Sequence, residues 1–471
     1  MSTDDGTHAG GAHAAGAGGP GGPAGKPAPS PHGSGSHAAR PEGSASEPLT
    51  AGEAATQSPG ASVSGRRAGS RFGPGLIIAA SFIGPGTITT SIVTGADYGH
   101  ALAWTIVFSI VATIILQEMT ARLGLGTRRG LGEAMREVFH SPVARLLMAV
   151  LVVAAIGIGG ASYAGGDTSG TALAVTNVVD VDTRIVVVVL IALIFALLWT
   201  GSYKLIEKVL MAMVAVLVVI FVVTAVIVRP NLGDLLGGMF VPSIPPGAIL
   251  TAIALIGTTV VPYNLFLQAQ LVKENWGQVP VDRAMKEART DTAVSIGIGG
   301  LITLAVMVTA VGSMFVRGIA AEEGTDLAEA LTPLLGDAAP WVFALGLFAA
   351  GFTSAIAGPL GAAYAITGVL GLSSDLRSTP ARIVWVAILV VGGAIALTGF
   401  NPIQIIVIAQ AANGLLLPIV AIFLMSVMNN RKLMGKYRNG PVANVLGWLI
   451  VAVVVFLAGY QFADIFGLLP Q

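Results

Sequence analysis

Four residues best suited to chemistry interrupt a long apolar run. Gly84, Pro85, Gly86 and Thr87 lie near the middle of the run from about residue 72 to residue 98. Pro85 cannot donate a backbone hydrogen bond, and glycines tolerate unwound dihedral angles. We therefore expect a helix break near the midplane of a membrane. The carbonyl and amide groups freed there persist only if they are buried in protein or line an aqueous cavity.

A second interruption of the same kind lies in the apolar run from about 248 to 272. It contains two threonines, Thr258 and Thr259, followed by Pro262 and Tyr263. Paired interrupted helices in two halves of a chain are typical of the substrate site of a secondary transporter. We predict that the substrate binds to residues of the two breaks and to a glutamine of a later run: Gly84, Pro85, Gly86, Thr87, Thr258, Val261, Pro262, Tyr263 and Gln410.

One carboxylate lies within an apolar run. Asp167 belongs to the run from about 143 to 176. A carboxylate inside a membrane is costly and usually marks a route for protons or ions, so we expect Asp167 to couple transport to a proton. Glycines and hydroxyl residues surround Asp167, which leaves open that the helix ends or is hydrated there. The polar residues of the breaks also have a plainer alternative role as hydrogen-bonding groups between helices.

The composition is that of a polytopic membrane protein. Hydrophobic residues make up 54% of the 471 residues and charged residues only 11%, compared with about 25% charged in soluble proteins. The chain has no cysteine, which excludes disulfides, thiolate metal sites and cysteine nucleophiles. It has neither a His-Glu-x-x-His motif nor an ATP-binding motif. We therefore expect a transporter driven by an ion gradient, without a cofactor, rather than an enzyme.

Eleven apolar segments are expected to cross the membrane as helices. They lie near residues 72–98, 101–122, 143–176, 184–200, 205–228, 248–272, 292–316, 340–370, 382–398, 402–428 and 441–466. Taking alternate loops, twenty Lys and Arg residues fall on one side and three on the other. This bias predicts a multi-pass protein of the cell (inner) membrane with its N-terminus in the cytoplasm and its C-terminus outside. The two broken helices then run antiparallel, as a 5+5 inverted repeat requires.

The first part of the chain differs from the rest. Residues 1–70 are rich in Gly, Ala, Ser, Pro and His and have almost no aliphatic periodicity. Such a segment cannot bury enough apolar surface to offset the entropy of ordering. We expect a disordered cytoplasmic tail, followed by a transmembrane transporter domain from residue 71 to residue 471.

Several short motifs resemble the NRAMP (natural resistance-associated macrophage protein) family of divalent-metal transporters. They are Gly73-Pro74-Gly75, Gly95-Ala96-Asp97-Tyr98-Gly99, Ala121-Arg122-Leu123-Gly124, Pro262 with Asn264-Leu265, and Arg431-Lys432-Leu433-Met434-Gly435. The resemblance implies an all-α, LeuT-like fold with broken first and sixth helices. It also implies proton-coupled symport of a divalent metal ion through a lipid bilayer.

The resemblance fails at the site itself. The family's first break reads Asp-Pro-Gly-Asn, and its sixth helix carries a Met before the proline and two His after it, whereas an Asp and a second acid occur in its third helix. The matching positions here are Gly84, Thr87, Val261, Tyr263, Gln268, Ala164 and Asp167. Only Asp167 keeps the family's type of side chain. By this correspondence Gln268 joins Asp167 as a predicted coupling residue.

Two classes of substrate stay open at this point. A divalent cation, held by oxygens of Gly84, Thr87, Thr258 and Gln410, would have to be a hard or hydrated ion, because neither an anionic nor a sulfur ligand remains at the breaks. The alternative is a small organic solute such as an amino acid, whose carboxylate would bind to the amides freed near Gly86.

Overall fold

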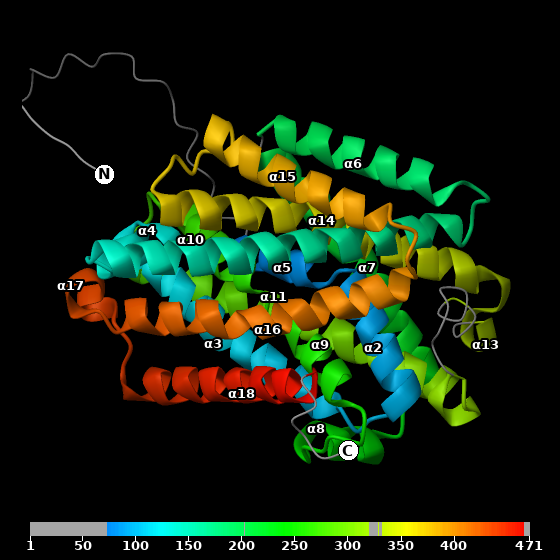
Figure 1. The fold of residues 1–471 in the computed structure, drawn as a ribbon. Coiled ribbons are helices and arrows are strands. Elements are labelled where there is room, and N and C mark those ends of the chain that lie inside the picture. Colours follow the sequence, from blue (N-terminus) through cyan, green and yellow to red (C-terminus); the bar gives the residue numbers. More distant parts are fainter. Residues whose placement is uncertain (1–72, 202, 320–327, 329–331, 466–471) are drawn as a thin grey trace, which may run out of the picture. The chain divides into compact units, whose positions relative to one another are not determined.

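The computed structural model describes residues 73–201, 203–319, 328 and 332–465. Figure 1 shows these residues as a bundle of helices. The tail predicted for residues 1–70 lies outside the described residues. The first half of the fold contains α1 (Pro74–Phe82), α2 (Pro85–Tyr98), α3 (Ala103–Thr127), α4 (Leu131–Val138), α5 (Pro142–Thr176), α6 (Thr183–Trp199) and α7 (Tyr203–Val228).

The second half begins with α8 (Leu232–Phe240) and the second broken helix, α9 (Ile249–Thr259) and α10 (Pro262–Trp276). It continues with α11 (Val281–Ser313), α13 (Thr332–Leu335), α14 (Ala339–Leu370), α15 (Thr379–Ala396), α16 (Pro402–Met428), α17 (Arg431–Met434) and α18 (Pro441–Ile465), and with the 3₁₀ turns Phe315–Arg317, Gly336–Ala338 and Gly435–Tyr437.

Proline acts differently at the breaks and inside other helices. Pro85 and Pro262 each stand at the first position of a new helix, α2 and α10. The missing N–H costs nothing at that position, and the fixed φ suits helix initiation. By contrast, Pro359 and Pro418 lie inside α14 and α16, which continue past them. Both predicted breaks are therefore present in the described chain, and each begins a second helix.

The helices have the length and apolarity of membrane spans. Among the described residues, nine spans qualify, and the bent pair α1 and α2 makes ten. The remaining predicted segment is α6, a shorter apolar helix of 17 residues. The axes of α1 and α2 differ by 53°, while Ile249–Trp276, which includes the second break, passes as one 28-residue span. The two breaks thus bend the chain to different degrees.

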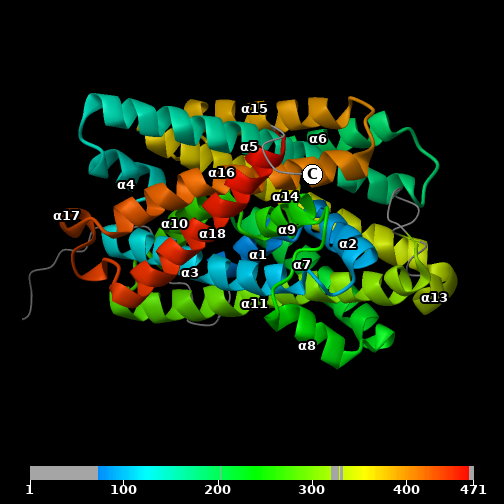
Figure 2. The same ribbon diagram turned by 60° about the horizontal axis from the view of Figure 1, so that its bottom comes forward.

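The two broken helices lie inside the bundle. α1 packs on α11, α14 and α10, and α2 packs on α11, α9 and α16. α5 runs along α14, α15 and α16, as Figures 1 and 2 also show. Almost every residue of α9 and α10 near the break is buried, while α7 turns many apolar side chains outward. The core helices are therefore shielded from lipid by the outer ones.

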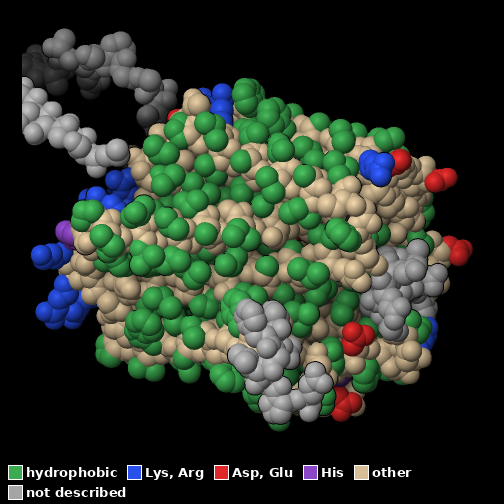
Figure 3. Space-filling view, viewed as in Figure 1, with side chains coloured by type: hydrophobic (Ala, Val, Ile, Leu, Met, Phe, Trp, Pro, Cys, Tyr) green, Lys and Arg blue, Asp and Glu red, His purple; other side chains and the backbone are tan. Residues whose placement is uncertain are grey.

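The outer surface carries apolar side chains between two polar ends. Exposed hydrophobic residues occur along α5, α6, α7, α15 and α18. On the face shown in Figure 3, most Lys and Arg side chains gather at the end where α4 and α17 lie, and Asp and Glu lie mainly towards the opposite end. This pattern is that of a multi-pass membrane protein.

Some boundaries differ from the sequence-based expectation. α5 is one continuous helix of 35 residues, so it does not end near Asp167. α11 begins at Val281, about ten residues before the predicted span, because the amphipathic segment that precedes the apolar run is also helical. The short helices α4 and α8 connect spans and were not predicted, since each is too short for a periodic apolar signal.

Candidate functional site

The first break leaves backbone groups without helical partners, and neighbouring hydroxyls bind two of them. Ser354 Oγ of α14 donates to the carbonyl oxygen of Ser81 at 2.9 Å. Thr87 Oγ1 donates to the carbonyl oxygen of Phe82. Gly84 is extended (φ −109°, ψ −177°) and directly precedes α2. The amides of Gly86 and Thr87, in the first turn of α2, have no intrahelical acceptor.

At the second break, the last carbonyls of α9 have donors from three other helices. Asn413 Nδ2 donates to the Gly257 carbonyl at 2.9 Å. Tyr163 and Thr113 donate their hydroxyls to the carbonyls of Thr258 and Thr259, both at 3.4 Å. Side chains of three neighbouring helices therefore bind the carbonyls that end α9.

A hydroxyl pair joins the two breaks. Thr87 Oγ1 lies 2.7 Å from Thr258 Oγ1. Both side chains are fully buried. The predicted meeting of the two interrupted helices is thus present, and two of the predicted substrate-binding residues are in direct contact.

Asp167 reaches the first break from α5. A Cβ atom added to Gly84 would lie 2.9 Å from Asp167 Oδ1 and 2.8 Å from Ser354 Oγ. Asp167 is fully buried, and neither carboxylate oxygen has a hydrogen-bond partner. The φ angle of Gly84 suits any residue, so the position requires glycine for space rather than for backbone conformation. The carboxylate occupies the space that a side chain at residue 84 would need.

Gln410 covers the next glycine of the same break. A Cβ atom on Gly86 would lie 2.0 Å from Gln410 Nε2. The glutamine side chain is fully buried, and neither its oxygen nor its nitrogen has a partner. Gln410, which the sequence placed in a separate run, is therefore at the break with an unused amide.

Tyr263 packs beside these groups. Its ring contacts Tyr163 edge-to-face with centroids 5.6 Å apart, and its hydroxyl is buried without a partner. A Cβ on Gly361 would lie 2.5 Å from the Tyr263 ring, so α14 is shaped to receive it. Both phenols interact electrostatically with Asp167.

Two predicted residues have other surroundings. Gln268 Nε2 donates to Thr292 Oγ1 of α11 at 2.9 Å. Val261 is buried and apolar, and offers only its backbone.

Three polar residues of the site were not predicted from the sequence. Ser81 Oγ lies 2.6 Å from Asn264 Oδ1 and thereby connects α1 to α10. Ser354 of α14 lies between Ser81 and Asp167. Tyr163 stands one helical turn before Asp167, and this i, i+4 spacing on one helix face was the signal that could have identified it.

A second buried carboxylate holds the start of α1. Asp291 of α11 accepts from the backbone N–H groups of Gly73 at 3.0 Å and Gly75 at 2.7 Å. The carboxylate binds amides that have no partner within the helix, and its negative charge interacts favourably with the positive end of the helix dipole. Asp291 is thus satisfied locally, in contrast to Asp167.

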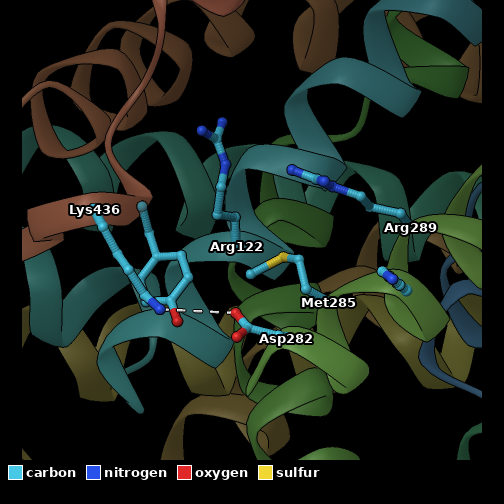
Figure 4. A pocket seen from close by; sticks show the side chains of 7 residues that line it. Arg122, Asp282, Met285, Arg289 and Lys436 are labelled. Atoms are coloured by element: carbon cyan, nitrogen blue, oxygen red, sulfur yellow. Dashed lines mark ion pairs between the residues drawn. The ribbon is translucent and has the colours of Figure 1, made fainter. Parts of the chain in front are cut away.

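A charged cavity lies away from the breaks, where α3 ends and α11 begins. This cavity, of about 350 Å³, is shown in Figure 4 and is lined by Arg122, Asp282, Met285, Lys286, Arg289, Lys436 and Tyr437. Glu118 lies 3.1 Å from Arg122 and 2.7 Å from Arg289, and Lys436 lies 3.8 Å from Asp282. Three of its four cations are therefore already paired with carboxylates.

The donor set at the breaks consists of oxygen atoms and one amide. The side chains of Thr87, Thr258, Asp167 and Gln410 offer hydroxyl, carboxylate and amide oxygens. Within the described residues, no three His, Cys, Asp or Glu side chains come together as a metal site would require. A cation here would be held by one carboxylate and neutral oxygens, the chemistry of hard ions.

Comparisons with known proteins identify relatives of this chain. Residues 75–464 match the family model described as natural resistance-associated macrophage protein-like. The divalent metal cation transporter MntH of Erwinia tasmaniensis is 30% identical over 391 residues, which are 83% of this chain and 93% of that protein.

Solved structures share the fold. The manganese transporter of Eremococcus coleocola has a TM-score of 0.66 at 21% identity and covers 85% of this chain and 88% of its own. MhsT in complex with L-phenylalanine has a TM-score of 0.56 at 16% identity and covers 83% and 99%. These likenesses confirm the predicted all-α, LeuT-like fold. With the family match, they also confirm the prediction of a transporter rather than an enzyme. The chain belongs to the Nramp family.

Proposed function

We propose that this protein is a secondary transporter that moves a hard divalent cation by alternating access around the two helix breaks. The relatives named above support a metal ion as cargo. The observation that carries the proposal is the Asp167 carboxylate, which is buried at the first break without a hydrogen-bond partner. An uncompensated carboxylate in a membrane protein is costly unless it meets a cation during the working cycle.

The composition of the site favours hard over soft ions. Where soft metals are selected, thiolate or thioether sulfur supplies ligands. Here the residue before Pro262 is Val261, whose side chain offers no ligand. Thr87, Thr258 and Gln410 offer neutral oxygens, which suit an ion that keeps some of its water. We therefore expect weak binding of cadmium and no preference for soft metals.

The alternative cargo, a small organic acid such as an amino acid, fits the geometry less well. Its carboxylate would bind at the N–H groups that begin α2. Gln410 lies against Gly86 in that place, and the Asp167 carboxylate lies beside Gly84. A second carboxylate would be repelled by the first in a site of low dielectric constant.

The driving ion is proposed to be the proton. Asp167 is the proposed coupling residue because it is the carboxylate at the break, and Gln268 is a proposed polar contact between α10 and α11. The membrane is proposed to be the cell (inner) membrane, with the N-terminus in the cytoplasm. The gathering of Lys and Arg at one end of the bundle supports this orientation.

The orientation can be tested directly, because the natural chain has no cysteine. Single cysteines in place of Arg283, at the start of α11, and Arg317, beyond its end, should react with an impermeant maleimide from opposite sides. Reaction of both positions from the outside of intact, right-side-out vesicles would contradict the proposed orientation.

Transport can be tested in liposomes containing the purified protein. Uptake of Mn²⁺ or Mg²⁺, measured with a trapped fluorescent indicator, should depend on the protein and increase with an inward proton gradient. A matched series with radiolabelled amino acids should show no uptake. Amino-acid uptake without cation uptake would instead favour the organic cargo.

A further inference from the structure

We infer that Asp167 of α5 is itself a direct ligand of the transported cation. Its carboxylate reaches the first break because Gly84 has no side chain to fill the space there. This inference rests on the proposed function and specifies its site. It changes the role of Asp167 from a relay residue beside the cargo to a direct ligand of the cargo.

The position of Asp167 is the first reason for this inference. Asp167 Oδ1 lies 2.9 Å from the point where a Cβ atom of residue 84 would stand. Residue 84 lies between α1 and α2, in the gap where the chain is extended. A carboxylate at this distance from the backbone occupies the same place that a side chain of the break itself would occupy.

The second step is the state of the neighbouring polar atoms. Both Asp167 oxygens, both polar atoms of the Gln410 amide and the Tyr263 hydroxyl are buried and have no hydrogen-bond partner. Most buried polar atoms in proteins are paired. Unpaired oxygens gathered at a helix break are groups prepared for a ligand, and a carboxylate among them selects a cation.

The third step is a comparison within the chain. Asp291 is buried to the same degree, but its carboxylate binds the amides of Gly73 and Gly75. Asp167 binds no backbone amide, and the Ser354 hydroxyl, which interacts with its carboxylate, donates its proton to the Ser81 carbonyl. The packing therefore satisfies one buried carboxylate and leaves the other available.

The last step is why the ligand comes from α5. α5 is continuous and packs along α14 and α16, so its side chains are held on a rigid helix. Under the proposed alternating access, the break would open while a ligand on α5 stays in place. Opening would then remove the cation's other ligands without carrying the carboxylate away.

The test measures Mn²⁺ binding to the full-length protein in nanodiscs, by the loss of the paramagnetic resonance signal of free Mn²⁺. Asp167→Asn keeps the size and removes the charge. We expect its affinity for Mn²⁺ to fall at least thirtyfold, while its melting temperature stays close to that of the natural protein, because the amide keeps the size of the carboxyl group. Asp291→Asn is the matched control, and it should keep its Mn²⁺ affinity within threefold.

Three results would overturn the inference. The first is an Asp167→Asn protein that binds Mn²⁺ within threefold of the natural protein. The second is an Asp167→Asn protein that loses affinity only together with a lowered melting temperature, which indicates a structural role. The third is absence of Mn²⁺ and Mg²⁺ binding and uptake by the natural protein, which refutes the proposed function first. Because the first two arise in a protein that does bind cations, they refute the role of Asp167 alone.

Discussion

The two helix breaks of this protein have the same sequence device, a proline that begins a new helix, but they differ in their bend and in the side chains that approach them. The first bends the chain by 53° and has glycines at which the side chains of Asp167 and Gln410 approach the backbone. The second lies within a span that passes as one helix, and its break residues, Val260 and Val261, are apolar and buried.

The difference separates a chemical break from a packed one. The carbonyls before the second break accept hydrogen bonds from Asn413, Tyr163 and Thr113, and the Tyr263 hydroxyl is the polar atom left without a partner among the side chains that follow its proline and face Asp167. At the first break, the side chains of Asp167 and Gln410 lie against the backbone glycines and lack hydrogen-bond partners. We conclude that the groups able to bind a ligand lie mainly at the first break, and that the second break packs against it.

The largest expected effect tests the packed break. A Cβ on Gly257 would lie 2.3 Å from the Gln410 carbonyl oxygen and 2.7 Å from the Gly414 nitrogen. Both are backbone atoms of α16, which cannot move aside alone. Gly257→Ala should therefore lower the free energy of unfolding by about 3 kcal/mol, seen as a lower melting temperature in detergent.

Gly86→Ala is the matched control at the first break. Its clash is with the side chain of Gln410, which can rotate. Its melting temperature should stay close to that of the natural protein, while its Mn²⁺ affinity falls. Equal losses of stability in the two variants would contradict the distinction between a packed and a chemical break.

The second prediction concerns the anchor of the first broken helix. Asp291→Ala leaves the N–H groups of Gly73 and Gly75 without their acceptor. Hydrogen bonds to a charged group contribute more than neutral ones, so we expect a loss of about 2 kcal/mol. Asp282→Ala, on the same helix, removes an exposed carboxylate paired with Lys436 at 3.8 Å. This control should be nearly neutral, and equal effects would show that the α1 anchor is not what Asp291 provides.

The sequence predicted the breaks but not what fills them. Pro85 and Pro262 predict a helix start because the effect of proline is local. Judged from the sequence alone, in contrast, Gly84 indicates only that the carboxylate ligand of the family motif is missing. In the structure, its Cα faces Asp167 and Ser354, which come from α5 and α14. No local pattern relates these three positions, because their contact is made by the packing of separate helices.

The same limit explains which polar residues the sequence does not reveal. The coupling role of Gln268 rests on family correspondence and stays a prediction; its side chain donates to Thr292 of α11. Ser354 was overlooked because a serine within a run of small residues gives no signal of its own in the sequence. Asp167 stood out because a charge within an apolar run is visible without tertiary information.

A smaller effect tests the contact between the breaks. Thr87→Val and Thr258→Val each remove one hydroxyl of the 2.7 Å pair. Hydrogen bonds between membrane helices contribute about 0.6 kcal/mol on average. We expect a coupling of that size in a double-mutant cycle of melting free energies. Thr113→Val, which removes a 3.4 Å contact with the second break alone, is the control. No coupling between Thr87 and Thr258 would mean that the breaks are held together only by packing.

The smallest expected effect concerns pH. It separates the pH dependence of Mn²⁺ binding at the first break from the pH dependence of stability at the turn after α2. His100 lies between α2 and α3, where burial lowers its pKa from the ordinary value of 6.5 and Asp234 partly opposes the shift. The folded protein therefore takes up this proton at a lower pH than the unfolded chain does. Stability should fall as the pH decreases below 6.5, because only the unfolded state gains the proton there.

His100→Gln cannot titrate, so its melting temperature should fall less between pH 7.5 and pH 5.5 than that of the natural protein. Asp234→Asn removes the interaction that raises the pKa of His100, so its melting temperature should fall more over the same range. Neither variant should alter the pH profile of Mn²⁺ binding, because His100 lies at the end of α2 away from the break. If His100→Gln flattens the pH profile of Mn²⁺ binding, the group that makes binding pH-dependent is His100 and not a residue of the first break. That result would contradict the distinction drawn between the two breaks.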